Sequence, residues 1–365
     1  MKITAAVAWR AGAPLEIEEV ELDEPRDDEI LVRVAAAGIC HTDMHARDGH
    51  LPVELPMILG HEGAGTVEGV GSDVTQVAVG DKVLLTPDYC GRCRRCRMGQ
   101  TTYCDNLVAV TFSGLRPDGS PRARQGDAAI RAAFFGQSSF ASHALATERN
   151  VLKVPHDAPL HHLAALTCGL PTGAGSVLNV VPVTVGSSFA VFGAGAVGLG
   201  AVMAAVVAGA TEIIAVDRVA HRLETATELG ATHVIHTEGG GDVAEEIREH
   251  TGGGCDVILD TTGVPALIRT AVESLDTRGT CGIVAGSGQD LSIPAAPLVR
   301  GGRTLRGIIG GEAIPGVFVP KLIALHERGR FPFDRLVRNY PFRQINEAIA
   351  DSISGTTIKP VLTFV

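Results

Sequence analysis

The sequence lacks the features that direct a chain to export, to a membrane or to nucleic acid. Residues 1–10 contain no apolar segment of the signal-peptide kind, so a cytoplasmic location is expected. No Lys/Arg-rich block interrupts a chain whose formal charge is −10, which disfavours binding to a phosphate backbone. We therefore expect no nucleic-acid partner.

One long stretch without charge, residues 189–210, has the length of a membrane span. It contains five glycines, has no flanking Lys/Arg bias, and changes from a strand-like to a helix-like pattern halfway along. A buried strand followed by a buried helix explains these features better, because such elements read as continuous apolar runs. The sequence thus predicts no membrane partner.

The chain also shows no disulfide framework, although it has eight cysteines. At 365 residues it is long enough for two domains, each with its own core, and needs no covalent cross-links. Six of the cysteines stand in spacings typical of metal sites, which suits a reducing compartment. Cys255 and Cys281 lie in or beside apolar runs, and we interpret them as small core residues.

Four cysteines form a C-x2-C-x2-C-x7-C pattern, namely Cys90, Cys93, Cys96 and Cys104. Four thiolates at such spacings can complete a tetrahedron around zinc, which makes a structural site. An iron–sulfur cluster and a pair of disulfides are the alternatives. A ferredoxin-type run would carry proline after its last cysteine, whereas Asp105 stands there. The pattern favours structural zinc.

A second group of ligand-type residues begins in the segment Gly38–His45, directly after the strand-like run 30–34. It contains Cys40, and His61 and Cys168 follow in two further glycine-containing segments. Two thiolates and one imidazole are a ligand set of catalytic zinc, with the fourth position left open for water or substrate. We expect these three side chains to meet at one metal.

The segment 191–198 contains G-x-G-x-x-G, formed by Gly193, Gly195 and Gly198, between a predicted strand and a predicted helix. Asp217 follows at the end of the next predicted strand, which completes the dinucleotide-binding context. Glycines allow the pyrophosphate to approach the helix N-terminus. A carboxylate at Asp217 accepts hydrogen bonds from ribose hydroxyls and repels a 2′-phosphate, so NAD is favoured over NADP, although the neighbouring Arg218 and Arg222 weaken this preference.

The coarse pattern predicts an α/β chain with two regions. Residues 1–170 read as β-rich, with strands at 30–34, 66–70 and 82–85. From 171 to 309, apolar strands alternate with helices, which is typical of a doubly wound parallel sheet. The predicted strands are 188–192, 212–217, 232–235, 255–260 and 279–285, and the predicted helices are 196–207, 220–229, 242–250 and 265–274. The last part, with helices at 319–328 and 344–352 and a strand at 361–365, is expected to fold back onto the first region.

With these motifs in this order, the whole chain resembles the zinc-dependent medium-chain alcohol dehydrogenases. Within that family it is most similar to the aryl-alcohol (benzyl alcohol) dehydrogenases, through Phe134–Ala141 (FFGQSSFA) and Ile358–Lys359–Pro360, and more weakly through GRFPFD at 329–334. The resemblance implies a GroES-like catalytic domain at 1–170 and 310–365, with a structural-zinc lobe at 88–106. It also implies a Rossmann NAD-binding domain at 171–309.

The resemblance further implies a role for each matching residue. Cys40, His61 and Cys168 match the catalytic zinc ligands, Glu62 the carboxylate behind the metal, and Asp43 the acid that orients the ligand histidine. Thr42 matches the hydroxyl that takes the substrate proton, and His45 the histidine that passes it to solvent through the cofactor ribose. The matching cofactor contacts are His41 and Lys359 at the pyrophosphate, Thr172 and Val197 at the nicotinamide, and Gly193, Gly195, Gly198, Asp217 and Arg222 around the rest of NAD.

These expectations combine into a reversible hydride transfer between an aromatic or allylic primary alcohol and NAD, giving the aldehyde, with two zinc ions per chain. A small-molecule substrate and a homo-oligomer, dimer or tetramer, are expected as partners. The alternative within the same class is an S-(hydroxymethyl)glutathione (formaldehyde) dehydrogenase, for which Arg116, Arg122, Arg124 and Arg131 would supply cationic anchors. An alternative of another class is a non-enzymatic nucleotide-binding protein.

Overall fold

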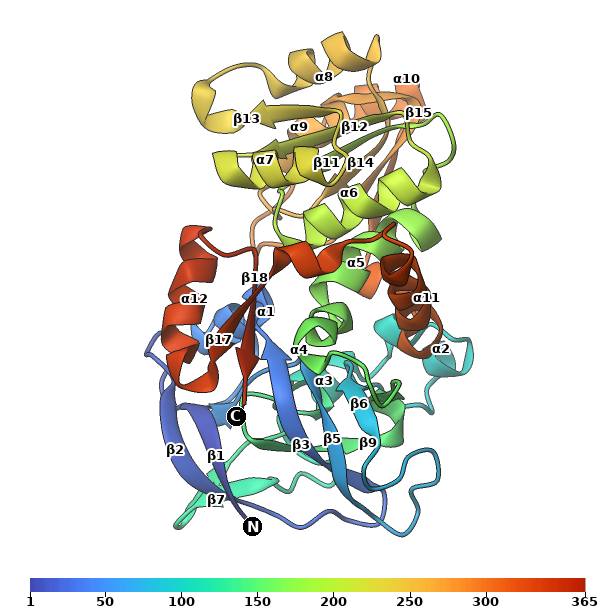
Figure 1. The fold of residues 1–365 in the computed structure, drawn as a ribbon. Coiled ribbons are helices and arrows are strands. Elements are labelled where there is room, and N and C mark those ends of the chain that lie inside the picture. The colour runs from blue at the N-terminus through green and yellow to red at the C-terminus, as the bar shows by residue number, and fades with distance from the viewer. Residues whose placement is uncertain (365) are drawn as a thin grey trace. The chain divides into compact units, whose positions relative to one another are not determined.

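The structure is a computed structural model that describes residues 1–364 (Figure 1). Contacts divide the chain into two compact units. Unit 1 comprises Met1–Cys168, Ile314–Gly316 and the residues from Leu336 onward; unit 2 comprises Gly169–Ala313 and Val317–Arg335. The sequence assigned all of 310–365 to the first domain, whereas the contacts group 317–335 with unit 2.

Unit 2 is built on a six-stranded parallel sheet in the order β13-β12-β11-β14-β15-β16. Its first strand is therefore central, and the later strands are added on both sides, which is the doubly wound Rossmann order. The predicted fold class is confirmed. The strands are β11 Ser188–Phe192, β12 Glu212–Asp217, β13 His233–His236, β14 Cys255–Asp260, β15 Leu275–Ile283 and β16 Thr304–Gly307.

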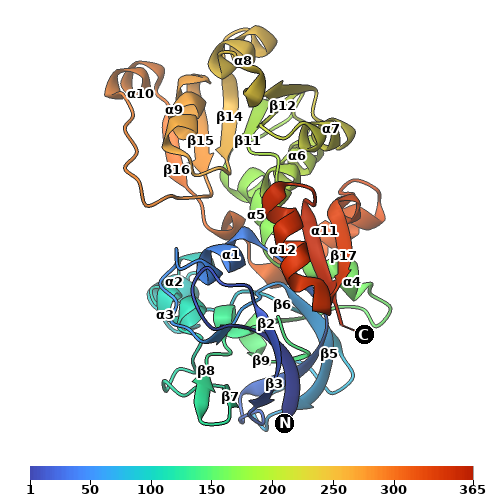
Figure 2. The same ribbon diagram turned by 90° about the vertical axis from the view of Figure 1, so that its left-hand side faces the viewer.

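Helices cover both faces of this sheet, with α6 and α7 along one face and α8 and α9 along the other (Figures 1 and 2). Strands enclosed on both faces must be apolar throughout, which explains why β11 and β14 read as uninterrupted hydrophobic runs. The helices are α5 Gly169–Gly175, α6 Ala196–Ala208, α7 Ala220–Glu228, α8 Val243–Thr251, α9 Pro265–Glu273, α10 Ala295–Gly301 and α11 Pro315–Glu327, the last of which begins in unit 1.

The uncharged run 189–210 divides into β11 and α6, as the sequence predicted. Most of both elements is buried, so the run forms interior rather than a membrane segment. Over residues 1–364, no single helix is long and apolar enough to cross a membrane, and only the bent pair 160–167 and 169–180 reaches that length and composition together.

Unit 1 contains two sheets around a shared hydrophobic core. One sheet has the order β4-β1-β2-β7-β8, and the other has the order β10-β6-β5-β3-β18-β17, with β9 also paired to β3. Strand β18 comes from the end of the chain and pairs antiparallel with β3, so the predicted return of the C-terminal part to the first region is observed. The predicted strand 361–365 overlaps β18, which spans Lys359–Thr363, and residue 365 lies outside the described residues.

The strands of unit 1 are β1 Lys2–Ala8, β2 Glu16–Leu22, β3 Glu29–Gly38, β4 Met57–Ile58, β5 Gly63–Val70, β6 Lys82–Leu85, β7 Ala123–Gln125, β8 Ala128–Ile130, β9 His143–Thr147, β10 Val151–Lys153, β17 Val337–Pro341 and β18 Lys359–Thr363. Its α-helices are α1 His41–Arg47, α2 Arg94–Arg97, α3 Leu107–Phe112, α4 Leu160–Leu163 and α12 Ile345–Ser354. The sequence reading missed α1–α4, because helices of four to seven residues are too short to show a 3.6-residue period.

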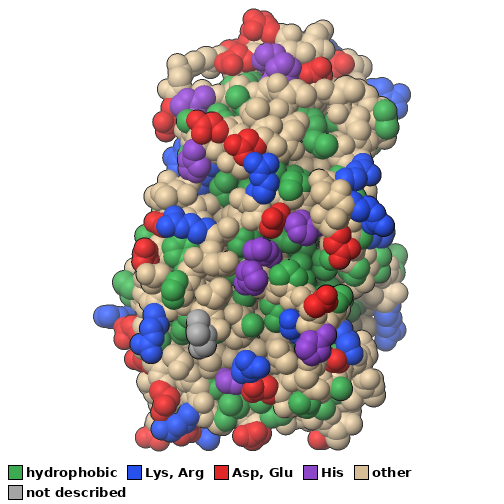
Figure 3. Space-filling model, in the orientation of Figure 1, with side chains coloured by type: hydrophobic (Ala, Val, Ile, Leu, Met, Phe, Trp, Pro, Cys, Tyr) green, Lys and Arg blue, Asp and Glu red, His purple; other side chains and the backbone are tan. Residues whose placement is uncertain are grey.

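A buried ion cluster joins the sheets of unit 1. The Glu29 carboxylate accepts hydrogen bonds from Nε and Nη2 of Arg116 at 2.9 and 3.0 Å and from Nε of Arg122 at 3.1 Å. All three side chains are less than 5% exposed. Over the face that Figure 3 shows, basic and acidic side chains are interspersed.

Replacing Glu29 by Gln is expected to lower the free energy of unfolding by about 3 kcal/mol, because the buried Arg122 guanidinium loses its counter-charge and Arg116 keeps only Asp23. Burial alone raises the pKa of Glu29, but the two arginines outweigh it and hold that pKa below its usual value. The loss of unfolding free energy in Glu29→Gln should therefore be complete near neutral pH and should shrink as the pH falls below about 4. Urea unfolding across pH measures it, with Glu21→Gln as the control, because the Glu21–Arg124 pair is more than half exposed and should show no measurable change.

Candidate functional site

The first ligand-type segment is organised by Asp43. Cys40 is the N-cap of α1, and its backbone N–H donates to Asp43 Oδ2 at 2.9 Å, which makes a capping box. The other oxygen, Oδ1, accepts the N–H of Gly60 at 3.1 Å and lies 2.7 Å from His61 Nδ1. A carboxylate can only accept, so Nδ1 carries the proton and Nε2 is left as the free lone pair. One buried side chain thus starts a helix and fixes the tautomer of His61.

Four donor atoms lie within 4.8 Å of one another in unit 1, and they come from Cys40, His61, Glu62 and Cys168. His61 Nε2 is 3.3 Å from Cys168 Sγ. Zinc bonds of about 2.0 Å to nitrogen and 2.3 Å to sulfur would set these atoms about 3.5 Å apart in a tetrahedron. The donor set and its spacing therefore fit a zinc ion.

The acid–base properties of this group follow from its burial. A hydrogen bond from the Cys168 thiol lowers the pKa of Cys40 well below its usual value. Burial acts in the opposite direction, and the neighbouring His61 adds to the lowering. The neighbouring Cys40 sulfur and then burial raise the pKa of Cys168. Burial disfavours the charged form of His61, but the Asp43 carboxylate outweighs it and raises the pKa of that imidazole. Ionising both thiols is unfavourable unless a cation lies beside them, so this donor set favours the binding of a metal ion.

Behind this group lies a buried ion pair between Lys359 Nζ and the Glu62 carboxylate. Both side chains are at most 2% exposed, and Nζ also donates to the backbone carbonyl of Ile39 at 3.2 Å. Burial raises the pKa of Glu62, and the Lys359 ammonium acts against that rise. The sequence reading placed Lys359 at the cofactor pyrophosphate; in the structure its ammonium lies on the carboxylate beside the metal ligands.

Aromatic rings surround the His61 imidazole. Phe135 stacks on it with 4.5 Å between ring centroids and an interplanar angle of 24°. Phe134 meets it edge-on at 5.8 Å, and Phe112 packs edge-on against Phe135 at 5.5 Å. The sequence reading quoted Phe134 and Phe135 only as a family likeness and did not place them at the metal site.

The loop that carries these phenylalanines is held by buried polar groups. Gln137 Oε1 accepts the N–H of Gly63 at 3.0 Å, and its Nε2 donates to the carbonyl of His61 at 3.0 Å. Ser138 Oγ donates to the Ile58 carbonyl and accepts the Phe134 N–H. Phe135 and Ser138 adopt positive φ, which is uncommon outside glycine and is maintained by these contacts. Three consecutive polar residues between phenylalanines, Gln137–Ser139, were the available sequence signal.

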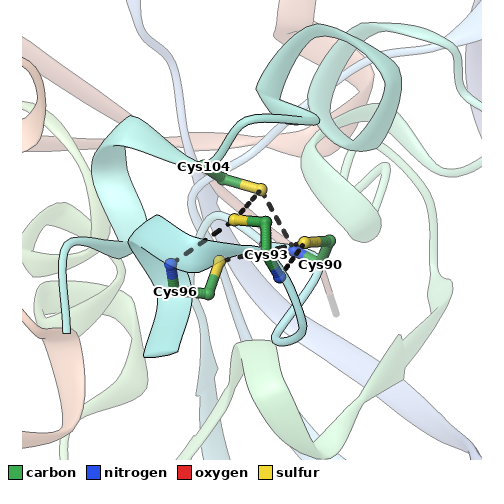
Figure 4. Close-up of side chains that lie close together, drawn as sticks. All are labelled: Cys90, Cys93, Cys96 and Cys104. Carbon is green, nitrogen blue, oxygen red and sulfur yellow. Dashed lines mark hydrogen bonds between the residues drawn. The ribbon is translucent and has the colours of Figure 1, made fainter. Parts of the chain in front are cut away.

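The four-cysteine lobe forms a second donor set, in which all four sulfur atoms converge (Figure 4). Cys90 Sγ lies 3.9 Å from Cys96 Sγ, and Cys93 Sγ lies 4.0 Å from Cys104 Sγ. Four zinc–sulfur bonds of about 2.3 Å would set the sulfurs about 3.8 Å apart, so the geometry fits zinc. Backbone N–H groups, among them those of Cys93, Cys96 and Asp105, donate to these sulfurs at 3.4 Å.

These thiols also respond to one another. Burial raises the pKa of Cys90, but amide donors outweigh it and bring that pKa to about 6. Burial and then the Cys93 sulfur raise the pKa of Cys96 to about 12. Among these four thiols one therefore ionises easily at the expense of another, and a bound divalent cation would remove that competition.

The glycine-rich turn of unit 2 follows β11. Gly193 has φ +95°, and the third glycine, Gly198, packs so closely that a Cβ there would lie 1.8 Å from the Gly193 carbonyl oxygen. A Cβ on Gly195 would meet nothing within 4 Å. Asp217 Oδ2 accepts the N–H of Ala194 at 2.6 Å, and Oδ1 accepts that of Val219 at 2.8 Å. This carboxylate is thus fixed to the turn, and each oxygen keeps accepting capacity for a ribose hydroxyl.

Two family models match the chain: the alcohol dehydrogenase GroES-like domain over residues 26–156, and the zinc-binding dehydrogenase over residues 196–326. Geraniol dehydrogenase of Castellaniella defragrans is 42% identical over 363 residues, which cover 99% of this chain and 97% of that protein. The chain belongs to the zinc-dependent medium-chain alcohol dehydrogenases. The predicted family is confirmed, and members use zinc and a nicotinamide cofactor.

Solved structures agree with this assignment. An alcohol dehydrogenase zinc-binding domain protein from Burkholderia ambifaria is 51% identical, with a TM-score of 0.97 and coverage of 100% of this chain and 99% of that one. Benzyl alcohol dehydrogenase from Acinetobacter calcoaceticus is 42% identical, with a TM-score of 0.96 and full coverage of both chains. This chain is accordingly an oxidoreductase of alcohols.

The remaining predicted site residues of this alcohol dehydrogenase lie in both units. In unit 1, Thr42 Oγ1 lies 3.7 Å from Cys40 Sγ, His41 is exposed on the first turn of α1, and His45 is exposed on its last turn. In unit 2, Thr172 and Val197 lie on α5 and α6, which pack in close contact. Arg222 lies in the first turn of α7, the helix that follows Asp217 in the chain.

Tyr89 does not join these residues. With Leu85, Phe112 and Phe140, it is one of four apolar or aromatic side chains of unit 1 that are candidates for lining a substrate pocket. Tyr89 instead lines a separate surface cavity of about 270 Å³ with Asp28, Asp73 and Glu148, while Leu85 and Phe140 are fully buried core residues. Phe112 alone lies in the aromatic group at His61.

Variants of the second and third glycines should separate folding from cofactor binding. Gly198→Ala forces a methyl group into a backbone carbonyl, so we expect a loss of stability of about 2 kcal/mol or more. Gly195→Ala meets open space in the protein, so its melting temperature should equal that of the wild type, while NADH binding weakens at least about tenfold because the methyl group fills the approach of the pyrophosphate. Thermal unfolding and NADH fluorescence titration measure the two effects; unimpaired NADH binding by Gly195→Ala would contradict this placement.

Proposed function

We propose that the chain oxidises aromatic or allylic primary alcohols to aldehydes with NAD, with unit 1 as the catalytic domain and unit 2 as the NAD-binding domain. The observation that carries this proposal is the stack of Phe135 on His61, with Phe112 packed against Phe135. Flat aromatic walls beside the metal ligands suit a flat apolar substrate. The printed activities of the relatives, geraniol and benzyl alcohol dehydrogenation, point the same way.

Cys40, His61 and Cys168 would hold the catalytic zinc. A zinc ion bound there supplies a Lewis acid that lowers the pKa of an alcohol hydroxyl and polarises an aldehyde carbonyl. Asp43 keeps the His61 proton on Nδ1, so that Nε2 faces the sulfur donors. Glu62 lies behind these donors, where Lys359 neutralises its charge. Cys90, Cys93, Cys96 and Cys104 would hold a second, structural zinc.

The alcohol proton must leave a buried site. The Thr42 hydroxyl can accept a proton and donate its own, and it adjoins the Cys40 sulfur. His45, one turn further along α1 and exposed, is the group that exchanges this proton with water. Phe135 and Phe134 cover the face and edge of His61 and exclude water from it.

NAD supplies the hydride acceptor when it is bound. Gly193, Gly195 and Gly198 would accept its pyrophosphate, with His41 proposed as a further contact, and Thr172 and Val197 would contact the nicotinamide. NAD is proposed over NADP because Asp217, fixed by two backbone N–H groups, presents a negative charge to the ribose. Arg222 is proposed as an additional contact beside it.

The alternative of an S-(hydroxymethyl)glutathione substrate loses support, because the four arginines that would anchor it pair with carboxylates of the chain and two of them are buried. Arg116 and Arg122 are buried on Glu29, Arg124 pairs with Glu21, and Arg131 pairs with Glu54. A non-enzymatic role is equally disfavoured, since the chain retains a complete donor set within a family of enzymes.

Association of two copies is proposed through β16. This strand ends the sheet of unit 2, most of its residues are exposed, and the exposed Val299 and Ile309 flank it. An open strand edge beside apolar side chains is suited to pairing with a second copy. A chain that sediments as a monomer would contradict this assignment.

A panel of alcohols tests the substrate class. We expect kcat/KM with NAD to be highest for benzyl alcohol and geraniol, far lower for ethanol, and lowest for S-(hydroxymethyl)glutathione. Phe135→Ala should reduce kcat/KM for benzyl alcohol at least about tenfold while changing that for ethanol little, because only the larger substrate loses the aromatic wall. The matched control is Phe364→Ala, which removes an aromatic stack against Phe342 elsewhere in unit 1. A preference for the glutathione adduct would refute the proposal.

Metal analysis tests the two donor sets. The purified chain is expected to contain two zinc ions, and Cys168→Ser should contain one while losing alcohol oxidation, because the open site then lacks a thiolate. Cys281→Ser, a buried cysteine outside both sets, should keep two. A single zinc per wild-type chain would contradict the assignment of one of the sites.

A further inference from the structure

The end of α1 brings two histidines together. Asp48 is the C-cap of the helix, and Gly49 adopts φ +79°, the left-handed conformation that allows the chain to reverse. The N–H of Gly49 donates to the carbonyl of Ala46 at 3.2 Å, and that of His50 donates to the carbonyl of His45 at 2.8 Å. These two bonds define a Schellman motif, in which the third residue from the helix end and the second residue beyond it lie side by side.

In most proteins that pair of positions carries an apolar contact. Here it carries His45 and His50, whose Nδ1 atoms are 3.3 Å apart, with 5.6 Å between ring centroids. The spacing is that of a hydrogen bond, so one Nδ1 carries a proton and the other accepts it. Both rings are exposed, which leaves the Nε2 atom of His50 open to water.

We propose that His50 is a positioning and proton-accepting partner of His45, so that the proton released by alcohol oxidation passes through a two-histidine relay before it reaches solvent. This inference rests on the proposed function of His45 and extends it by one residue. The proton path proposed above ends at His45, whereas the hydrogen bond between the two Nδ1 atoms extends it to His50.

The transfer is balanced and needs no co-reactant. His45 takes a proton at Nε2 and releases the Nδ1 proton to Nδ1 of His50. His50 then loses its Nε2 proton to water or to a buffer base, and both rings return to the neutral form with their tautomers exchanged. A second passage in the reverse sense, or rotation of the rings, restores the starting tautomers. No electrons move, since the redox step lies in the hydride transfer.

The charged groups beside the pair on the same turn are Arg47 and Asp48. The Asp48 carboxylate is held by the Arg47 guanidinium at 2.7 and 3.1 Å. The bond to Arg47 lowers the pKa of the Asp48 carboxyl, and burial acts against it. The fields of His50 and His45 add smaller contributions to the lowering. The loop 10–13 packs on the same turn through the N–H of Gly12 and the Arg47 carbonyl; its charged residue, Arg10, has no contact with either ring among the described residues.

Two substitutions at His50 separate proton transfer from a purely structural role. His50→Ala removes both the hydrogen bond and the proton acceptor. His50→Asn keeps a polar group at the δ position that can bond to His45 Nδ1 but cannot carry a proton onward. His156→Ala, an exposed histidine elsewhere in unit 1, is the matched control.

The measured quantity is the transient rate of benzyl alcohol oxidation by the zinc-loaded enzyme with NAD, at pH 7, as a function of buffer concentration. The wild type and His156→Ala should show no dependence. His50→Ala and His50→Asn should both be slower in dilute buffer, by about fivefold, and both should recover with added imidazole. If either His50 variant keeps the wild-type rate and shows no buffer dependence, the relay is overturned. Recovery in His50→Asn alone would show that His50 acts only as a hydrogen-bond partner of His45, because asparagine keeps that bond but cannot carry a proton onward.

A second readout does not depend on turnover. In protein labelled with ¹⁵N-histidine, the wild type should show a scalar coupling between the two Nδ1 atoms across their hydrogen bond, and His50→Ala should lose it. Absence of that coupling in the wild type would overturn the inference. If the wild type oxidises no alcohol at all, the proposed function fails and the relay with it; alcohol oxidation with unaffected His50 variants overturns the relay alone.

Discussion

The hydrogen bonds of Asp43 are the constraint on which the rest of the catalytic arrangement depends. One oxygen caps the backbone N–H of Cys40 at the start of α1, and the other receives the proton of His61. Two candidate metal ligands from different segments are thereby held by a single buried carboxylate. Because the bond to Nδ1 decides which nitrogen of His61 has a free lone pair, the ability of that residue to bind a metal follows from Asp43 rather than from the histidine itself.

Around that constraint, unit 1 concentrates groups that are unfavourable in isolation. Two thiols, an imidazole and a carboxylate share a space in which every pair of donors is within 4.8 Å, and the protein supplies one compensating ammonium, Lys359. A polar cluster of this kind is stable only when its charges are balanced. The same reasoning applies to the four-cysteine lobe, where amide N–H groups supply part of the balance and a divalent cation supplies the rest.

The proposed substrate specificity depends on which side chains near His61 remain to contact a substrate once the charged groups are paired with one another. Two of the cationic residues that a carboxylate-bearing substrate would need, Arg116 and Arg122, are buried in the fold, and Arg122 donates to Glu29 and to backbone carbonyls. What remains near His61 is aromatic, and Phe135 is held over the imidazole ring in an uncommon backbone conformation. An alcohol that is flat and apolar matches such a site through stacking and the exclusion of water.

The sequence by itself determined the family, the fold class and the identity of the donor residues, because cysteine spacing and G-x-G-x-x-G are local patterns that backbone geometry enforces directly. Strands β11, β12 and β14 were predicted at their observed bounds, since strands buried on both faces carry an unbroken apolar signal. Only the tertiary structure decided that Lys359 lies on Glu62, that Phe135 stacks on His61 and that Tyr89 belongs to another surface. These contacts join residues far apart in the sequence, and their geometry depends on how the sheets pack, which no local pattern records.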